Sequence, residues 1–222
     1  GNNKTYLYSY DPDVFGKKEL IGNWGFTNVT KNWNWKDADQ KPVQVAVFSN
    51  GDEVELIQNG TSVGKLTSGT RLAADLPHSF LFDLTYLPGT LEAVSYKDGK
   101  EISRDTLVTT GPAKELRLIQ EKKELSANGH EVAYVRVEIV DENGIVVPDA
   151  ALRLSAAVEG VGSLAAFGSS NPITDENYTS GTFTSYHGTA TAIIRSGYQT
   201  GMCTLTVGCE GLDEKKIAFT IK

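Results

Sequence analysis

The chain contains little cysteine, and its two cysteines are badly placed for a disulfide. They are Cys203 and Cys209, among 222 residues. On an extended strand, six residues at about 3.3 Å each put them on one face roughly 20 Å apart, whereas a disulfide needs Cα atoms within about 7 Å. We therefore expect two unpaired thiols that fill a buried apolar face, as free cysteines often do.

Long apolar runs and an excess of positive charge are missing as well. No run approaches the roughly 20 apolar residues that span a bilayer, so we expect no membrane partner. The formal net charge of −7 argues against a nucleic-acid partner, because phosphate binding needs clustered lysine and arginine. Gly1 looks like a remnant of tag cleavage and no signal-peptide pattern follows it, so the sequence does not indicate a compartment.

Motifs for metals, cofactors and nucleophiles are also scarce. His78, His130 and His187 are scattered without metal-ligand spacing, so each is expected at the surface or at a strand end. Neither a P-loop nor a Gly-x-Gly-x-x-Gly fingerprint is present, and we expect no nucleophile elbow of the hydrolase kind. The sequence therefore predicts no metal and no cofactor.

Carboxylates occur in close pairs, which raises the question of a glycosidase site. The pairs stand at positions 11 and 13, 37 and 39, 52 and 53, and 175 and 176. A glycosidase needs two carboxyl groups about 5 to 10 Å apart across a cleft, whereas these lie in polar turns, where aspartate bends or caps the backbone. We expect solvated turns, with bound Ca²⁺ at one of them as the alternative, and no catalytic residue.

What the chain does have is strand-like alternation. In residues 132–140 apolar positions alternate with Tyr134, Arg136 and Glu138, and similar alternation recurs at 203–207 and 217–221. This pattern is typical of an antiparallel strand with one face in the core. The best helical candidate, 121–127, covers one or two turns at most.

Turn sequences separate these runs at the spacing of a sandwich. Asn59-Gly60 and Asp98-Gly99 each divide two strand-like runs, and both are hairpin signals because their residues tolerate positive φ. Further reversals are expected at 50–51 and 143–144. We count about seven short strands in each half, which predicts an all-β fold of two tandem immunoglobulin-like β-sandwich domains of about 100 residues each.

The join between the domains is expected at Gly111-Pro112, because this pair interrupts strand pairing. The first domain then covers residues 1–112 and includes an aromatic-rich N-terminal segment. The second covers residues 113–222. Within it, residues 168–187 are expected to form a long irregular loop, and loops of that length often carry function.

Tryptophans are the candidate binding residues. In an extended segment Trp33 and Trp35 project on the same side, so their indoles could stack on sugar rings, with Trp24 and Tyr178 as further members of such a platform. The other interpretation places the indoles in a core or a domain interface, where they bury a large apolar area. We favour the second interpretation on that ground.

Several segments, in order along nearly the whole chain, resemble the C-terminal region of bacterial glycoside hydrolase family 2 enzymes, the β-galactosidase and β-glucuronidase family. In the first half they are 10–16 (YDPDVFG), 22–26 (GNWGF), 32–35 (NWNW), 45–64 (VAVFSNGDEVELIQNGTSVG) and 86–101 (YLPGTLEAVSYKDGKE). In the second half they are 135–148 (VRVEIVDENGIVVP), 160–172 (GVGSLAAFGSSNP), 176–181 (ENYTSG) and 188–195 (GTATAIIR). The run at 140–148 alone is a weak signal, because bacterial immunoglobulin-like adhesin repeats share it.

The resemblance implies an accessory role without catalysis. The family's two catalytic glutamates lie in a (β/α)₈ barrel of about 250 residues, and no residue here matches them, so this chain is not expected to be an enzyme by itself. The implied partner is the catalytic barrel of the same parent chain, a bacterial β-galactosidase-like enzyme, cytoplasmic or exported. Two alternatives stay open: a carbohydrate-binding module that uses Trp33 and Trp35, and an adhesin stalk, although the two halves show no clear internal repeat.

Overall fold

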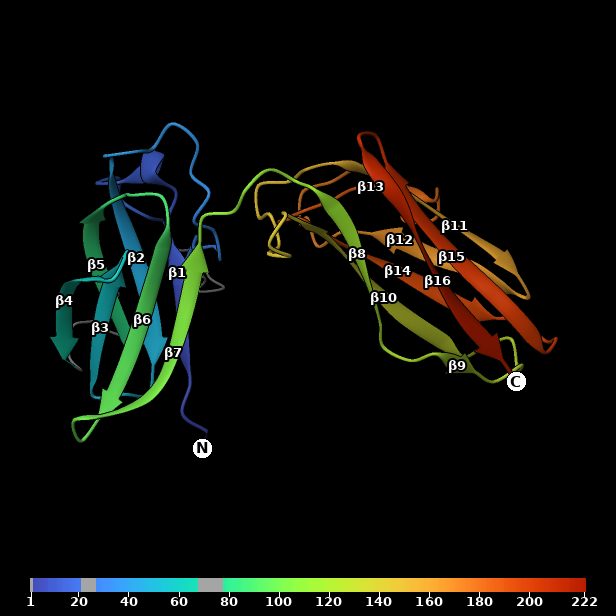
Figure 1. The fold of residues 1–222 in the computed structure, drawn as a ribbon, viewed down its shortest axis with the longest axis horizontal. Helices are drawn as coiled ribbons and strands as arrows, with labels where there is room; N and C mark the ends of the chain where they lie inside the picture. Colours follow the sequence, from blue (N-terminus) through green and yellow to red (C-terminus); the bar gives the residue numbers. More distant parts are fainter. Residues whose placement is uncertain (1, 21–26, 68–77) are drawn as a thin grey trace. The chain divides into compact units, whose positions relative to one another are not determined.

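The chain folds almost entirely into β-strands. The computed structural model describes residues 2–20, 27–67 and 78–222, which form sixteen strands and one short 3-10 helix (Figure 1). Two compact units result, Gly1–Thr109 and Thr110–Lys222, and the division lies just before the Gly111-Pro112 pair. Within the described residues, no helix is long and apolar enough to cross a membrane.

The first unit consists of two antiparallel sheets with strand orders β1-β2-β5 and β4-β3-β6-β7. Its elements are β1 (Thr5–Ser9), helix η1 (Pro12–Val14), β2 (Pro42–Ser49), β3 (Glu53–Gln58), β4 (Thr61–Thr67), β5 (Ser79–Thr85), β6 (Thr90–Lys97) and β7 (Lys100–Val108). Alternate residues of the strands face inward, among them Leu7, Val45, Leu56, Phe80 and Leu91, and form one buried cluster. This is the sandwich pattern, with apolar faces of both sheets in a shared core.

Hairpin turns of the first unit follow the turn sequences. Asn59 and Gly60, at φ 50° and 79°, join β3 to β4, and Asp98 and Gly99, at φ 50° and 71°, join β6 to β7. Positive φ at both turn residues matches the right-handed twist of the flanking strands. Asn59 also accepts a hydrogen bond from the Thr90 N–H at 2.8 Å through its side chain. The turn is thereby tied to the start of a neighbouring strand.

Replacing Gly60 with alanine should destabilise the chain by about 1 kcal/mol, because a Cβ is disfavoured at positive φ. No other atom lies within 4 Å of the position that this Cβ would take, so backbone strain is the cause of the loss. Urea unfolding followed by circular dichroism measures it. The matched variant Gly60→Asn should lose less, since asparagine tolerates this conformation. Equal losses for the two variants would contradict the explanation.

The second unit is also a two-sheet sandwich, with strand orders β12-β14-β10-β8 and β13-β11-β15-β16-β9. Its strands are β8 (Glu115–Gln120), β9 (Glu124–Leu125), β10 (Val132–Val140), β11 (Arg153–Gly160), β12 (Gly162–Gly168), β13 (Thr182–Thr184), β14 (Thr189–Ser196), β15 (Gly201–Cys209) and β16 (Leu212–Ile221). Both sheets contribute to one core that includes Val135, Phe167, Phe183, Leu205 and Phe219. The prediction of an all-β chain of tandem sandwiches is therefore confirmed.

Two segments differ from the sequence-based prediction. The helical candidate at 121–127 contains β9, which pairs in parallel with the end of β16 through Glu124 and Leu125. The expected irregular stretch at 168–187 contains β13, which pairs with β11. Both strands are too short for periodicity to register, and each forms because a distant strand offers it backbone partners.

The cysteines lie on β15 and are free thiols. Cys203 is buried in the core and Cys209 is half-buried against it. A register shift between Val207 and Cys209, at the position of Gly208, interrupts the pairing of β15 with β16 between them, while β15 itself is continuous. Burial raises the pKa of both thiols, which disfavours the thiolate form that reacts.

The reversal after β10 is organised by one buried carboxylate. Asp141, 2% exposed, accepts the N–H groups of Asn143 and Ile145 through Oδ1, each at 2.9 Å. Its Oδ2 accepts the N–H of Gly111 at 3.0 Å. Burial alone would raise the pKa of this carboxyl, but the hydrogen bonds from Ile145, Gly111 and Asn143 outweigh it and lower the pKa. Asp141 thus connects the turn to the segment that precedes β8.

Candidate functional site

Trp33 lies inside the first unit. Its side chain is 1% exposed, and its ring meets that of Tyr86 edge to face with centroids 4.8 Å apart. The indole Nε1 donates to the carbonyl of Leu87 at 3.2 Å. The Trp33 carbonyl accepts hydrogen bonds from the Tyr86 hydroxyl at 2.9 Å and from Thr109 Oγ1 at 2.8 Å. An indole without an exposed face cannot stack on a sugar, so this structure offers no platform at Trp33.

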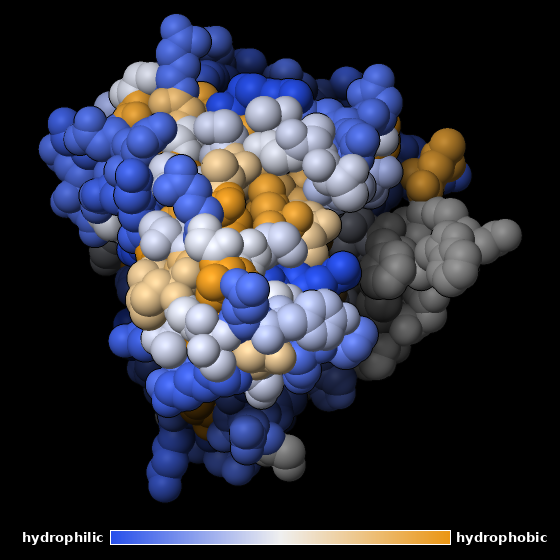
Figure 2. Space-filling view, turned by 90° about the vertical axis from the view of Figure 1, so that its right-hand side faces the viewer, coloured by the Kyte–Doolittle hydropathy of each residue, from blue (hydrophilic) through white to orange (hydrophobic). Residues whose placement is uncertain are grey.

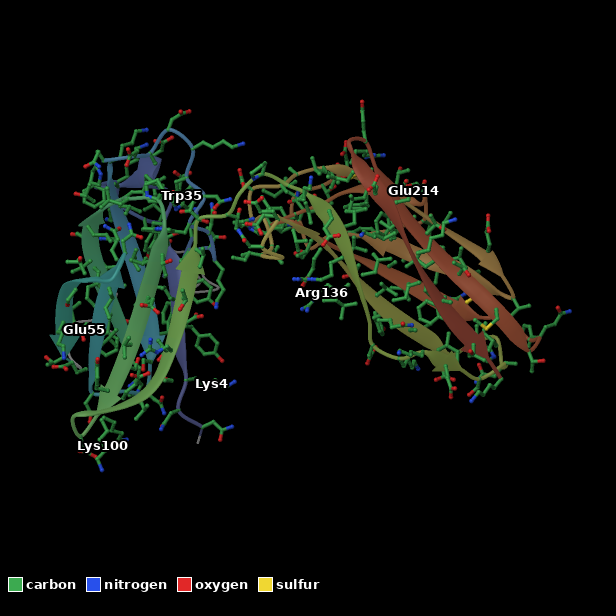
Figure 3. All side chains as sticks on the ribbon, in the orientation of Figure 1. Lys4, Trp35, Glu55, Lys100, Arg136 and Glu214 are labelled. Carbon is green, nitrogen blue, oxygen red and sulfur yellow. The ribbon has the colours of Figure 1, made fainter. Side chains whose placement is uncertain are left out.

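Trp35 is half-buried, and its indole has a different hydrogen-bond partner from that of Trp33. Its Nε1 donates to Ser9 Oγ at 3.1 Å, and its backbone N–H donates to the Tyr86 hydroxyl at 3.4 Å. Figure 3 shows Trp35 and Lys4 toward opposite ends of the first unit. Trp24 lies outside the described residues. Trp33 and Trp35 lie in an irregular segment, so strand alternation does not apply to them, and their indoles bond to different parts of the unit.

Tyr178 belongs to the second unit and is 45% exposed. Its ring lies over that of Phe183, with centroids 4.6 Å apart, and a Cβ at Gly168 would clash with it. The Tyr178 carbonyl accepts the N–H of Phe167 at 2.7 Å. The ring therefore covers one side of the core, and its outer face remains available to solvent.

Two of the paired carboxylates, Asp11 and Glu176, accept backbone N–H groups. Asp11 caps helix η1 by accepting the Asp13 N–H at 2.9 Å. Glu176 accepts the Thr184 N–H at 3.1 Å and forms an ion pair with Arg153. Over the described ranges, no group of three or more histidine, cysteine, aspartate or glutamate residues could hold a metal ion.

None of the displaced carboxyl pKa values suits a general acid. Among the described residues, the carboxyl groups with a displaced pKa are all lowered, namely Glu55, Glu101, Glu115, Glu131 and Asp141. For the four glutamates the largest cause is a hydrogen bond donated by a neighbouring side chain; the pKa of Glu131 falls to about 2 beside Lys122. A glycosidase needs one carboxylic acid whose pKa is raised.

A hollow of about 570 Å³ lies beside helix η1, lined in part by Tyr10, Lys17, Glu19 and Leu20. The Tyr10 hydroxyl donates to Glu19 Oε2 at 3.3 Å, and Glu19 Oε1 accepts the Asn28 N–H at 2.5 Å. Burial and the nearby Glu19 charge raise the pKa of Tyr10 to about 12. Among the described lining residues, Glu19 is the one carboxylate and is already bonded, whereas glycoside hydrolysis requires a pair.

The segment 60–64 has the residue pattern of a nucleophile elbow but forms a different structure. Residues 60–64 read Gly-Thr-Ser-Val-Gly, which matches the Gly-x-Ser-x-Gly of hydrolase nucleophile elbows. An elbow places its serine on a sharp turn between a strand and a helix. Here Gly60 belongs to a hairpin turn and Ser62 lies within β4, paired with Ile57 of β3. The pattern is therefore part of a β-hairpin and not an elbow.

Exposed apolar residues also occur in the second unit. Figure 2 looks onto the side at the right of Figure 1 and shows a group of hydrophobic residues bordered by hydrophilic ones.

A hollow of about 350 Å³ in this unit is lined by residues 160–163 and 197–199. Its lining has no charged side chain and is rich in glycine. Apolar residues are common on folded surfaces, and this hollow offers little for specific recognition.

Aromatic residues on the outer face of the β1-β2-β5 sheet were not among the predicted site residues. Tyr6 and Tyr8 of β1 alternate with the buried Leu7, and Phe48 of β2 lies opposite Tyr6. The alternation of tyrosine in residues 5–9 is the sequence signal that could have pointed to them. Their pairing with Phe48, some forty positions away, was not visible in the sequence.

Comparisons with known proteins agree with this architecture. Residues 116–218 match the family Glycoside hydrolase family 2 C-terminal domain 5, and residues 40–103 match a domain of unknown function (DUF4982). The chain is 29% identical to Beta-galactosidase BoGH2A of Bacteroides ovatus over 94% of its own length and 23% of the relative. It is 30% identical to a beta-galactosidase of Thermoanaerobacter pseudethanolicus over 77% of its length, again 23% of that relative.

A solved structure has the same fold. The glycosyl hydrolase family 2 member from Bacteroides cellulosilyticus superposes with a TM-score of 0.88 at 27% identity, covering 100% of this chain and 28% of the other. The chain thus spans about a quarter of the length of the relatives that it matches. It belongs to glycoside hydrolase family 2, as the C-terminal accessory region of such an enzyme.

Proposed function

We propose that this chain is the non-catalytic part of a β-galactosidase-like enzyme and that it supports the enzyme's catalytic barrel. The observation that carries the proposal is how little of its relatives the chain covers. It corresponds to 23% of the length of each of two relatives named β-galactosidases. A (β/α)₈ barrel needs about 250 residues of alternating strands and helices. The described residues are arranged as two β-sandwiches, so the catalytic part belongs elsewhere in such a protein.

The carboxylate chemistry supports the same proposal. The described carboxyl groups with displaced pKa values favour the ionised form, and Asp11 and Glu176 of the paired carboxylates accept backbone N–H groups. Neither set offers the neutral acid that protonates a leaving sugar oxygen. The sandwiches instead provide rigid bodies with large, well-packed cores, which suits a role in positioning or stabilising a neighbouring domain.

The pure chain should not hydrolyse nitrophenyl β-galactoside or nitrophenyl β-glucuronide. We expect no release of nitrophenol above the buffer blank, because no carboxylate pair in the described part of the chain is placed for the reaction. The parent enzyme, assayed in parallel, is the positive control and should favour the galactoside. Turnover by the isolated chain that persists through a second purification would refute the proposal.

A further inference from the structure

The outer face of the β1-β2-β5 sheet carries a cluster of three aromatic side chains that are not part of the core. Tyr6, Tyr8 and Phe48 project from this face, whereas Leu7 and Val47 between them point into the core. Tyr6 pairs directly with Phe48 across the two strands, and the rings of Tyr8 and Phe48 meet edge to face with centroids 6.0 Å apart. Tyr6 is 43% exposed, so its ring is accessible beside the other two.

Two hollows adjoin this aromatic group and share Tyr6 and Phe48 as walls. One, of about 330 Å³, also contacts Tyr8, Thr27 and Val29. The other, also about 330 Å³, is lined further by Asn2, Lys4, Ser49, Asn50 and His78. Each volume is at the lower end of the range for small-ligand sites. Rings thus form the middle of the surface, and polar side chains form one end.

The polar end is already organised by hydrogen bonds. Asn50 Oδ1 accepts the backbone N–H of Lys4 at 3.2 Å, and Asn50 Nδ2 donates to Asn3 Oδ1 at 3.5 Å. The carbonyl of His78 accepts the Ser49 N–H at 2.9 Å. These bonds connect β1, β2 and the start of β5, so the amides are positioned before any ligand arrives. Such preorganisation reduces the entropic cost of binding.

The chemistry of the lining points to one class of ligand. We propose that this surface, made by Tyr6, Tyr8, Phe48, Asn50 and Lys4, binds a saccharide. A pyranose ring presents C–H groups on its face, which pack on an aromatic ring, and hydroxyl groups at its edge, which both donate and accept. Amide side chains also donate and accept, and the lysine ammonium donates. Among the described residues no carboxylate lines either hollow, so their lining admits both neutral sugars and uronic acids.

A lipid or a protein segment fits this lining less well. A lipid tail would not use the amides and the ammonium group, and a large protein interface would need a wider continuous apolar area. The inference does not rest on the accessory role proposed above, because sugar binding at this sheet requires neither a barrel nor hydrolysis. It assigns sugar contact to β1 and β2 in place of the tryptophans.

Binding is tested by titrating the full chain with lactose and, separately, with methyl β-glucuronide. Isothermal calorimetry and amide chemical shifts are the two readouts. We expect saturable shifts concentrated in residues 4–8 and 48–50 for at least one of the sugars. Tyr6→Ala should weaken binding about tenfold or more, as loss of a central aromatic contact does, and Tyr6→Phe should retain most of it.

Tyr134→Ala is the matched control, because Tyr134 is 48% exposed on a strand of the second unit. It should bind as the unaltered chain does. The proposal fails if neither sugar produces saturable shifts at its solubility limit, or if Tyr6→Ala binds as tightly as Tyr134→Ala. Either result would leave the hydrolysis assay unaffected, so a failure here is distinguishable from failure of the accessory role.

Discussion

Replacing Trp33 with alanine is expected to lower the free energy of unfolding of the first unit by about 3–5 kcal/mol, the range for large aromatic residues removed from a core. The side chain is 1% exposed and packs against Tyr86 and the inward faces of both sheets. Its removal leaves a cavity, and it also leaves the Leu87 carbonyl without the indole donor. Native-state hydrogen exchange of amides in β2 and β6 measures the loss.

The second unit provides an internal reference for this experiment. Amides in β10 and β15 belong to a separate core, so their protection should stay unchanged in Trp33→Ala. Trp35→Phe is the matched variant, because it keeps a ring but loses the bond from Nε1 to Ser9 Oγ. It should cost about 1 kcal/mol, the usual value for one hydrogen bond. A loss for Trp33→Ala no larger than that of Trp35→Phe would contradict the assignment of Trp33 to the core.

Asp141→Ala should destabilise the second unit by about 3 kcal/mol at neutral pH. The substitution leaves the N–H groups of Gly111, Asn143 and Ile145 without their acceptor, and hydrogen bonds to a charged group are worth about 1.5–3 kcal/mol each. Water that reaches the opened turn should hydrogen-bond to these N–H groups and restore part of the lost stabilisation free energy. Hydrogen exchange of amides in β10 and β14 is the measurement.

The same carboxylate predicts a pH dependence. The pKa of Asp141 is lowered in the folded chain, so the folded state favours the ionised form. Its contribution is complete above the ordinary aspartate pKa of about 3.9 and is lost as the pH falls through the lowered folded value. The stability difference between the unaltered chain and Asp141→Asn should therefore be largest near neutral pH and shrink below about pH 4.

Asp213→Asn is the control for the pH experiment, because Asp213 is an exposed aspartate on β16 of the same unit. It should follow the unaltered chain at every pH. If Asp141→Asn also follows the unaltered chain through the acidic range, the hydrogen bonds of the carboxylate do not stabilise the turn, and another contact must connect β10 to the segment before β8.

A saccharide surface on the first sandwich would give the accessory region a role beyond support. Hydrolysis occurs at one sugar linkage, whereas Tyr6 and its neighbours could hold another part of the same substrate. That arrangement would raise the affinity for extended substrates over simple nitrophenyl sugars. The titrations above decide whether the surface has this capacity, and they use the isolated chain, so no catalytic turnover complicates the readout.

Local features of the structure were largely predictable from the sequence. Alternation at 132–140 marked the strand that the structure places at Val132–Val140, and Asn59-Gly60 and Asp98-Gly99 marked hairpins that adopt positive φ. These predictions succeed because side-chain alternation and turn conformation depend on residues close together in the chain. The unpaired cysteines were predictable for the same reason, since strand geometry separates positions 203 and 209.

Contacts between distant segments were not predictable in this way. Alternation suggested that Trp33 and Trp35 share one face, but they lie in an irregular segment whose course depends on hydrogen bonds from Tyr86 and Thr109 to Trp33. Strand β9 exists because the end of β16 pairs with it. The sequence by itself determined the all-β character and the hairpins. Only the tertiary structure decided which aromatic residues are buried and which form a surface, because burial depends on the register between strands far apart in the chain.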